Sequence, residues 1–208
     1  WTLVYGDTTS TLAGALAAVK LHIPVAHVEA GLRSFNRMMP EEINRVMTDH
    51  VSALLFCPTP TAVKNLKKEG ITAGVRLVGD AMYDAVNLYA AQAERRTDTL
   101  ERFGVKPRGY FLATVHRAEN TDDLSRLKIL VSALSRIAEI TAPVIIPLHP
   151  RTRNVMEKHA LKFGPSVKVC KPLPYGDVQT LLHHARGLLT DSGGMQKEAA
   201  IHRVPCVT

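Results

Sequence analysis

Residues 27–45 read H-V-E-A-G-L-R-S-F-N-R-M-M-P-E-E-I-N-R, and this stretch decides how the whole chain is interpreted. The apolar run at 24–28 predicts a short buried strand, and the stretch 40–49 predicts a helix. Between and after them come Glu29, Arg33, Arg37, Glu41 and Glu42. Ligands of open α/β sheets bind at the carboxyl ends of strands, so this segment suits an anionic ligand and carboxylate chemistry. A solvated loop with surface ion pairs is the alternative.

Strand and helix patterns alternate through the rest of the chain. The predicted strands are 2–5, 24–28, 53–57, 75–78, 110–115, 143–148, 166–170 and 187–190, and the predicted helices are 8–20, 40–49, 59–69, 81–94, 121–140, 151–163, 176–184 and 194–202. The strands are short apolar runs without clean alternation, as expected when helices cover both faces of a parallel sheet. This pattern predicts an α/β fold with two Rossmann-like, doubly wound domains and a cleft between them.

A charged segment broken by Gly and Pro, at 96–109, is the predicted linker. We therefore expect an N-terminal domain at 1–95 that carries carboxylates and a C-terminal domain at 110–208 that binds nucleotide. The chain begins at Trp1 and ends at Thr208 inside apolar runs. We expect from this an internal piece of a longer protein, with both domains incomplete.

Composition narrows the class of partner. The 208 residues carry a formal charge of +7, and residues 1–100 hold ten Lys/Arg against ten Asp/Glu, whereas 101–208 hold sixteen against nine. With five Phe, five Tyr, one Trp and no dense basic run, the sequence disfavours nucleic acid and favours a phosphate-bearing small ligand on the second half. No run approaches the ~20 apolar residues of a membrane span, and no secretory signal is visible.

The cysteines indicate the redox compartment. Cys57, Cys170 and Cys206 are odd in number and lie far apart. They fit neither a disulfide framework nor a zinc site, so we expect no metal and a reducing, cytoplasmic environment. Each lies in or beside an apolar run, which predicts buried thiols.

Polar groups follow five of the predicted strands. They are Asp7, Glu29, the cluster His116-Arg117-Ala118-Glu119-Asn120, the pair His149 and Arg151, and Asp191-Ser192. A single residue such as Asp7 is more often a helix cap than a functional group. Five such strand ends at one sheet edge instead indicate a site.

The segment D-S-G-G at 191–194 has the clearest physical interpretation. Two glycines at a helix N-terminus let the backbone approach an anion, which the free N–H groups and the helix dipole hold. Ser192 adds a donor, and Glu198 accepts hydrogen bonds from sugar hydroxyls, which favours a nucleotide. The alternative is a capped helix with a tight turn. Neither G-x-G-x-x-G nor G-x-x-x-x-G-K-[ST] occurs.

Five motifs resemble those of the non-hydrolysing UDP-N-acetylglucosamine 2-epimerases, in family order over essentially the whole chain. They are V-Y-G-D-T-T-S at 4–10, H-V-E-A-G-L-R-S at 27–34, M-P-E-E-I-N-R at 39–45, T-V-H-R-A-E-N at 114–120 and L-T-D-S-G-G-M-Q-K-E-A at 189–199. The resemblance implies two domains like those of glycosyltransferase-B enzymes, with a UDP-sugar in the cleft. It also implies that the family's N-terminal G-T-R-P-E loop and the region after residue 208 are missing here.

The family reaction interconverts UDP-N-acetylglucosamine and UDP-N-acetylmannosamine. UDP is eliminated anti across C1–C2 to give 2-acetamidoglucal, and it re-adds after C2 is protonated from the other face. Two faces of the sugar need two acid/base groups. The resemblance further implies a cytoplasmic homodimer without a cofactor that serves cell-surface polysaccharide biosynthesis.

The resemblance also assigns site residues. Asp7, Glu29 and Glu41 match the catalytic carboxylates, and the sequence leaves open which serves which face. His116 matches a histidine beside the pyrophosphate, where an imidazolium stabilises the leaving UDP. Ser192, Gly193 and Gly194 match the phosphate site, Glu198 the ribose site, and 172–178, with Leu173, Tyr175 and Val178, the uracil pocket. Val178 stands where relatives often carry an aromatic residue, which Tyr175 would replace. Further substrate contacts are expected from Arg33, Arg117, Asn120, His149 and Arg151.

Two other functions stay open. A hydrolysing relative would release free N-acetylmannosamine and UDP from the same fold, and a UDP-sugar binder or glycosyltransferase would use the nucleotide half alone. The carboxylates at 7, 29 and 41 argue against the binder, because binding alone needs no acid near the anomeric carbon. The H-R-x-E-N motif with the short S-F-N-R loop favours the non-hydrolysing enzyme.

Overall fold

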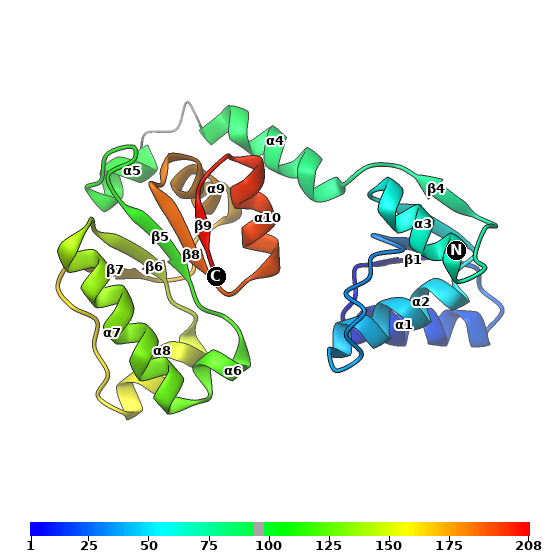
Figure 1. The fold of residues 1–208 in the computed structure, drawn as a ribbon, viewed down its shortest axis with the longest axis horizontal. Coiled ribbons are helices and arrows are strands. Elements are labelled where there is room, and N and C mark those ends of the chain that lie inside the picture. The colour runs from blue at the N-terminus through cyan, green and yellow to red at the C-terminus, as the bar shows by residue number, and fades with distance from the viewer. Residues whose placement is uncertain (94–97) are drawn as a thin grey trace. The chain divides into compact units, whose positions relative to one another are not determined.

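The computed structural model describes residues 1–93 and 98–208. The chain divides into two compact units, Trp1–Ala81 and Met82–Thr208, which we call unit 1 and unit 2. Each unit contains one sheet of parallel strands with helices packed on it (Figure 1). The predicted α/β class with two Rossmann-like units is therefore confirmed.

Unit 1 is built on four parallel strands in the order β1-β2-β3-β4. They are Thr2–Tyr5, Val25–Val28, Leu54–Cys57 and Val75–Leu77, and they are connected by α1 (Thr9–Lys20), α2 (Pro40–Val51) and α3 (Pro60–Lys68). Val4 and Val25 pack with Ala15 of α1. Leu55 packs with Leu66 of α3, so apolar residues of the predicted strands form the core of this unit, although Leu3 and Leu77 are exposed.

The helices of unit 1 begin where capping chemistry allows. The Thr8 side chain accepts from the Thr11 N–H at 3.3 Å to start α1, and the Thr59 side chain accepts from the Ala62 N–H at 3.1 Å to start α3. A proline occupies the first turn of α2, where its missing N–H costs nothing.

Unit 2 holds five parallel strands in the order β7-β6-β5-β8-β9. The strands are β5 (Phe111–Thr114), β6 (Val144–Pro147), β7 (Val167–Cys170), β8 (Gly187–Thr190) and β9 (Cys206–Val207). The helices are α4 (Ala81–Ala93), α5 (Asp98–Phe103), α6 (Ala118–Thr121), α7 (Leu124–Ile140), α8 (Pro150–Lys158), α9 (Tyr175–His184) and α10 (Gly193–Ile201). The strand order reverses beside β5, and such a reversal marks the ligand edge of a doubly wound sheet.

Both faces of the unit 2 sheet are covered. Leu112 of β5 belongs to a core cluster with Leu181 of α9, whereas its neighbour Ala113 belongs to one with Leu134 of α7. Successive strand side chains point to opposite faces, which explains the two clusters. In Figure 1, α7 and α8 accordingly lie on one side of the sheet, with α9 and α10 on the other.

Two predicted helices differ from the structure. The helix expected at 121–140 begins at Leu124 instead, because the Asp123 side chain accepts from the N–H groups of Ser125 and Arg126 at 2.8 and 3.2 Å and caps α7 there. The helix expected at 151–163 ends at Lys158. Ala160 there has a φ of 51°, a left-handed residue of the kind that ends helices.

The chain divides before α4, earlier than the predicted linker. Residues 96 and 97 of the linker lie outside the described residues, and 98–103 form α5, whose Thr99 hydroxyl donates to Asp177 of α9 at 3.2 Å. Helix α4, expected in the N-terminal domain, packs in unit 2, where Tyr89 meets the Tyr175 ring edge-on at 4.9 Å. Within the predicted linker, the charged residues 98–103 thus form a packed helix, and Gly104 and Pro107 follow its end.

Three general expectations bear on the surface. Cys57 is buried, which raises its pKa to about 11, but Cys206 is exposed in β9, so the expectation that every thiol is buried is wrong.

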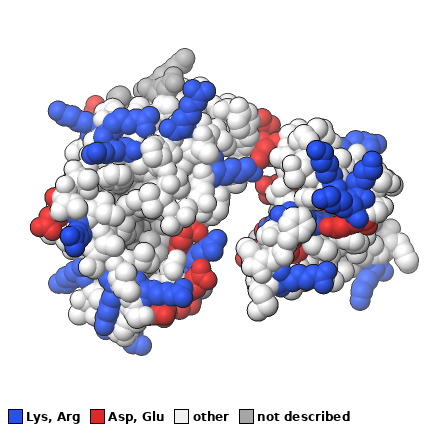
Figure 2. All heavy atoms as spheres, viewed as in Figure 1, with Lys and Arg blue, Asp and Glu red and all other residues white. Residues whose placement is uncertain are grey.

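Across residues 1–93 and 98–208, no helix is long and apolar enough to cross a membrane. On the face drawn in Figure 2, Lys and Arg side chains are spread over both units with acids among them.

Candidate active site

The carboxyl ends of β1 and β2 bring Asp7 and Glu29 to one edge of the unit 1 sheet. Tyr5 pairs with Val28 in register, so the two chains leave the sheet side by side. Gly6 has a φ of 63°, and a Cβ placed on it would lie 3.6 Å from Oε2 of Glu29. The Glu29 carboxylate therefore lies against the turn that carries Asp7.

Glu29 has a backbone φ of 71°, in the left-handed region that residues with a side chain rarely adopt. Such strain costs about 1–3 kcal/mol, and it concentrates at active sites. The flanking backbone is anchored, because the Ala30 N–H donates to the Phe56 carbonyl at 3.1 Å and the Gly31 N–H donates to Asp49 Oδ2 at 3.0 Å. These bonds hold the Glu29 backbone in the strained conformation.

His27 joins the two strand ends from within the core, where it is fully buried. Its Nε2 is 2.8 Å from the Gly6 carbonyl and its Nδ1 is 2.7 Å from Asp49 Oδ1. The carbonyl oxygen can only accept, so Nε2 carries a proton. Since Asp49 also accepts from Gly31, one buried carboxylate of α2 holds both the strand end and the loop around Glu29.

Helix α2 supplies the partners of Asp7. Arg45 Nη2 donates to the Asp7 carboxylate, and Asn44 Nδ2 donates to the Asp7 carbonyl at 2.9 Å. Glu41 is exposed in the first turn of α2, four residues before Arg45. Residues four apart share a helix face, so α2 presents Glu41 on the side from which Arg45 reaches Asp7.

Glu42, the next residue of α2, closes the loop instead. It is buried and accepts from Ser34 N and Oγ at 2.8 and 2.9 Å and from Phe35 N at 2.9 Å. Burial acts to raise the pKa of Glu42, but the hydrogen bonds from Ser34 and Phe35 hold it below its usual range. Of the two adjacent acids, Glu41 is thus the one available to a ligand.

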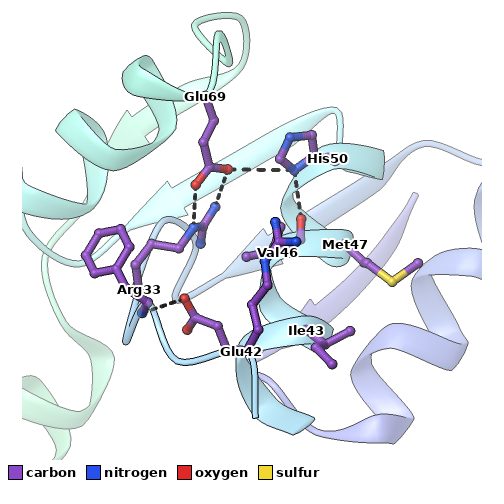
Figure 3. Close-up of a pocket in the computed structure, with 9 residues that line it drawn as sticks. Arg33, Glu42, Ile43, Val46, Met47, His50 and Glu69 are labelled. Atoms are coloured by element: carbon purple, nitrogen blue, oxygen red, sulfur yellow. Dashed lines mark hydrogen bonds and ion pairs between the residues drawn. The ribbon is translucent and has the colours of Figure 1, made fainter. Parts of the chain in front are cut away.

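Arg33, predicted to contact substrate, is engaged by other residues of unit 1. Its Nε and Nη2 donate to Glu69 at 2.7 and 2.8 Å, a fork visible in Figure 3, and its Nη1 donates to Asp49 at 2.7 Å. Burial opposes the charge, but these two carboxylates keep the pKa of Arg33 above its usual range. The geometry gives Arg33 a structural role, tying the loop after β2 to the end of α3.

A depression of about 700 Å³ lies beside Arg33, lined on α2 by Ile43, Val46, Met47 and His50 (Figure 3). With 100° of rotation per residue, this stripe is opposite the face of α2 that carries Arg45 and Asn44. This depression therefore opens away from Asp7.

A second cavity, of about 330 Å³, opens at the carboxyl edge of the unit 2 sheet. It is lined by Thr114, His116, Pro147, His149, Pro172, Leu173, Tyr175, Val178, Met195 and Glu198. Six of these ten were predicted as site residues from their sequence motifs: His116, His149, Leu173, Tyr175, Val178 and Glu198. The structure therefore brings His116 together with residues predicted for the uracil and ribose sites. Ser192, Gly193 and Gly194 of the predicted phosphate site are not among the described lining residues, nor is any Lys or Arg.

Asp191 organises the loop after β5. Its carboxylate accepts from the backbone N–H groups of His116 and Arg117, both at 3.0 Å, and from Asn120 Nδ2 at 2.9 Å. Burial acts to raise the pKa of Asp191, but these donors hold it below its usual range. The predicted ligand-contacting loop is thus fixed by the first residue of the D-S-G-G motif.

The start of α10 has the geometry expected of an anion site. The Ser192 N–H donates to Thr190 Oγ1 at 3.0 Å, and the Ser192 side chain accepts from the Met195 N–H at 3.4 Å as the cap. A Cβ on Gly193 would meet nothing within 4 Å, so the space before the first helical turn is open. Free N–H groups at such a helix end attract phosphate.

Glu198, on the second turn of α10, is buried beside the cavity. It accepts from Tyr175 OH at 3.2 Å and from Gln179 Nε2 at 2.7 Å. Burial raises the pKa of Glu198, and the two hydrogen bonds oppose this rise. Burial, followed by the influence of Glu198, raises the pKa of Tyr175 to about 12, so this phenol stays a donor.

The other predicted polar contacts differ in placement. Asn120 is bound to Asp191, and Arg151 Nη2 contacts the exposed Asp122 carboxylate at 2.6 and 2.8 Å. Arg117 Nη1 is 3.5 Å from Glu119, and both side chains are exposed. His149 accepts from the Arg151 N–H at 3.2 Å and lines the cavity. Of these four predicted contacts, only His149 lines this cavity.

Sequence reasoning gave no role to two residues that hold the site, Asp49 and Gln179. It placed Asp191 at a strand end of the site but missed that its carboxylate holds the loop of His116, although β8, the strand before Asp191, pairs with β5, the strand before that loop. Asp49 and Gln179 lie inside helices, and only tertiary packing brings them to their partners.

Comparison with known proteins shows which family the chain resembles. The family model described as UDP-N-acetylglucosamine 2-epimerase matches residues 1–208. A UDP-2,3-diacetamido-2,3-dideoxy-D-glucuronate 2-epimerase of Pseudomonas aeruginosa is 53% identical, over 99% of this chain and 57% of the relative. A UDP-N-acetylglucosamine 2-epimerase of Methanocaldococcus jannaschii is 46% identical, over 99% of this chain and 58% of the relative. The chain thus spans less than three fifths of these curated relatives.

Solved structures of the same family are similar to this chain as well. The M. jannaschii UDP-GlcNAc 2-epimerase in complex with UDP-GlcNAc and UDP matches with a TM-score of 0.85 at 46% identity, over 98% of this chain and 58% of that one. The Neisseria meningitidis UDP-GlcNAc 2-epimerase bound to UDP-GlcNAc matches with a TM-score of 0.84 at 31% identity, over 99% and 58%. Fold, strand-end motifs and overall similarity together show that this chain belongs to the UDP-N-acetylglucosamine 2-epimerase family.

Proposed function

We propose that the full-length protein reversibly epimerises C2 of a UDP-linked 2-acetamido sugar, interconverting UDP-GlcNAc and UDP-ManNAc. The observation that carries this proposal is the placement of Asp7 and Glu29 at adjacent strand ends, with a Gly6 Cβ position only 3.6 Å from Glu29 Oε2. Binding of a nucleotide alone needs no such acids. Their presence supports proton transfer at the sugar over a UDP-sugar binder or glycosyltransferase.

In the forward direction, a carboxylate of unit 1 removes the C2 proton while the C1–O bond to UDP breaks. The C2–H electron pair becomes the C1=C2 bond of 2-acetamidoglucal, and the C1–O pair leaves with UDP. A second carboxyl group, in its acid form, then protonates C2 from the opposite face with the C1=C2 electron pair, and a UDP oxygen re-forms the bond at C1. Asp7, Glu29 and Glu41 are the candidate acid/base groups for the two faces.

Unit 2 is proposed to hold UDP throughout. The N–H groups at Gly193 and Gly194 with the Ser192 hydroxyl would bind phosphate, and His116, as an imidazolium, would stabilise the charge that develops on the leaving UDP. Glu198 would accept from ribose hydroxyls, with the uracil against Leu173, Tyr175 and Val178. Retention of UDP is essential, because re-addition requires that it stay bound.

A second substrate follows from the 53% identity to the 2,3-diacetamido-glucuronate epimerase of P. aeruginosa. That sugar also carries an acetamido group at C2, so the same elimination and re-addition apply to it. The two substrates are distinguished by incubating full-length protein with each UDP-sugar and following C2 epimers by NMR. The proposal predicts epimerisation of at least one, and turnover of neither would refute it.

The same spectra decide between the non-hydrolysing and hydrolysing reactions. Retained UDP predicts that free ManNAc stays below the level of the UDP-sugars at equilibrium. Stoichiometric free ManNAc with UDP would assign the hydrolysing reaction. Glu157→Gln, an exposed acid on α8, is the matched control for Glu29→Gln and should leave turnover unchanged.

We further propose, from the family resemblance alone, a cytoplasmic homodimer without a cofactor that serves cell-surface polysaccharide biosynthesis. Light scattering on the full-length protein tests the dimer. A single monomer mass across micromolar concentrations would refute it.

A further inference from the structure

A chain of side-chain hydrogen bonds runs from the unit 2 cavity into the core. Glu198 Oε2 accepts from Gln179 Nε2 at 2.7 Å, and Gln179 Oε1 lies 2.7 Å from His202 Nε2. His202 Nδ1 in turn lies 3.2 Å from His183 Nδ1. Helix α9 and the end of α10 are thus connected, through buried polar atoms, to Glu198, the only carboxylate among the described residues that line the cavity.

The chain has one consistent direction. A carboxylate only accepts, so the amide nitrogen of Gln179 faces Glu198 and its oxygen faces His202, which must donate from Nε2. Burial, then the nearby His183 and His184, lowers the pKa of His202 to about 4, so the ring is neutral. A neutral ring protonated at Nε2 accepts at Nδ1, where His183 can donate. Every donor in the chain therefore points toward Glu198.

Burial makes these groups costly unless they act together. Gln179 is fully buried and His202 is 7% exposed, beside the apolar cluster that includes Leu181, Leu182 and Ala199. A buried polar group without a partner costs about 1–3 kcal/mol. Two apolar side chains would fill the same space without that possible loss of stability. Such a chain is favourable only when complete, and here it ends on Glu198.

We propose that Gln179 and His202 are positioning residues that hold Glu198 as an oriented carboxylate for the ribose hydroxyls of the UDP-sugar. The inference rests on the proposed function, in which Glu198 faces ribose. Gln179 acts directly on Glu198, and His202 acts through Gln179 by fixing the orientation of its amide.

Few groups around Glu198 can orient its carboxylate. Tyr175 is its other donor, and Tyr89 of α4 packs edge-on against that ring. His116 and His149 line the same cavity from the ends of β5 and β6, whereas His183 and His184 of α9 lie behind His202. Since no Lys or Arg is among the described lining residues, Gln179 and Tyr175 are the donors that favour the ionised form.

The consequence is a specific dependence on pH and on ribose. Burial raises the pKa of Glu198, and Gln179 lowers it, so removal of the Gln179 donor moves the pKa further up. UDP affinity should then fall most at low pH and recover as pH rises. The affinity for ligands without ribose hydroxyls should not change when the Gln179 donor is removed.

The test is calorimetric titration of the full-length protein with UDP and with 2′,3′-dideoxyuridine diphosphate at pH 6.5 and 8.5. Gln179→Met should weaken UDP binding about tenfold at pH 6.5, the scale of one hydrogen bond to a charged group, with a smaller loss at pH 8.5. Binding of the dideoxy ligand should change less than about twofold at either pH. Thr180→Val, a buried neighbour whose hydroxyl donates to the Gly176 carbonyl, is the matched control and should show neither dependence.

His202 supplies a second pair of variants if Gln179→Met does not fold. His202→Leu should reproduce the pattern, whereas His202→Gln, which keeps a donor, should restore much of the affinity. Equal losses for both ligands at both pH values would overturn the inference by showing a merely structural effect. Wild-type protein that fails to bind UDP, or fails to distinguish the dideoxy ligand, would refute the proposed nucleotide site itself.

Discussion

Asp49→Asn tests whether one buried carboxylate holds the loop that carries Glu29. In the wild type, Asp49 accepts from His27 Nδ1 at 2.7 Å, Gly31 N at 3.0 Å and Arg33 Nη1 at 2.7 Å, with its side chain fully buried. An amide keeps the shape but removes the charge and turns an NH₂ toward at least one of these donors. Breaking a buried ion pair on one side costs about 3–5 kcal/mol, which is the expected loss in the free energy of unfolding.

Two assays separate the global from the local part of this effect. Urea unfolding of the full-length protein should show the loss of stability, and amide exchange should show the loop around Gly31 opening at least about 100-fold more often. Glu69→Gln is the matched control, because Glu69 shares Arg33 but is partly exposed, so about 1 kcal/mol is expected from it. A loss below about 1 kcal/mol for Asp49→Asn, or equal losses for both variants, would refute the reasoning.

Three further predictions follow from the same contacts. Ser192→Ala combined with Glu198→Ala should weaken UDP binding of the full-length protein, whereas Glu29→Gln should leave it nearly intact; calorimetry that finds the larger loss in Glu29→Gln would contradict the division between units. Hydrogen bonds hold the pKa of Glu42 below its ordinary 4.5. Its contribution to the free energy of unfolding is therefore present above pH 4.5 and is lost as pH falls through the folded-state pKa. Unfolding followed as a function of acid pH should show this dependence weakened in Glu42→Gln. Gly31→Ala should lower the free energy of unfolding by more than about 2 kcal/mol, because its Cβ would meet the Ala62 carbonyl oxygen at 2.5 Å. Gly70→Ala, with a similar φ and nothing within 4 Å, should cost about 1 kcal/mol. Equal shifts of the melting temperature would contradict this.

Local chemistry accounts for what the sequence predicted well. Short apolar runs marked each strand from β1 to β8. The reason holds best for β2, β5, β6 and β8, which are mostly buried, because a strand covered on both faces needs apolar side chains throughout. D-S-G-G marked the start of α10, and the cavity beside it contains the predicted Leu173, Tyr175 and Glu198.

The rest depended on contacts that no local pattern encodes. Arg33 carries the charge of a ligand-binding residue, but only the folded chain shows Asp49 and Glu69 around it. Charge and a Gly-Pro break predicted a linker where α5 packs, because Thr99 and Leu100 face α9 and the core only after folding. The relay through Gln179 and His202 likewise joins residues 23 positions apart.

The most direct test of the proposed reaction is deuterium incorporation at C2, followed by NMR with full-length protein in D₂O. Elimination and re-addition require that an enzyme acid, exchangeable with solvent, protonate C2, so both UDP-GlcNAc and UDP-ManNAc should acquire deuterium there. Glu29→Gln and His116→Ala should each slow this exchange about a hundredfold or more, whereas Glu157→Gln should not. Epimerised product with no deuterium at C2 would contradict the elimination route.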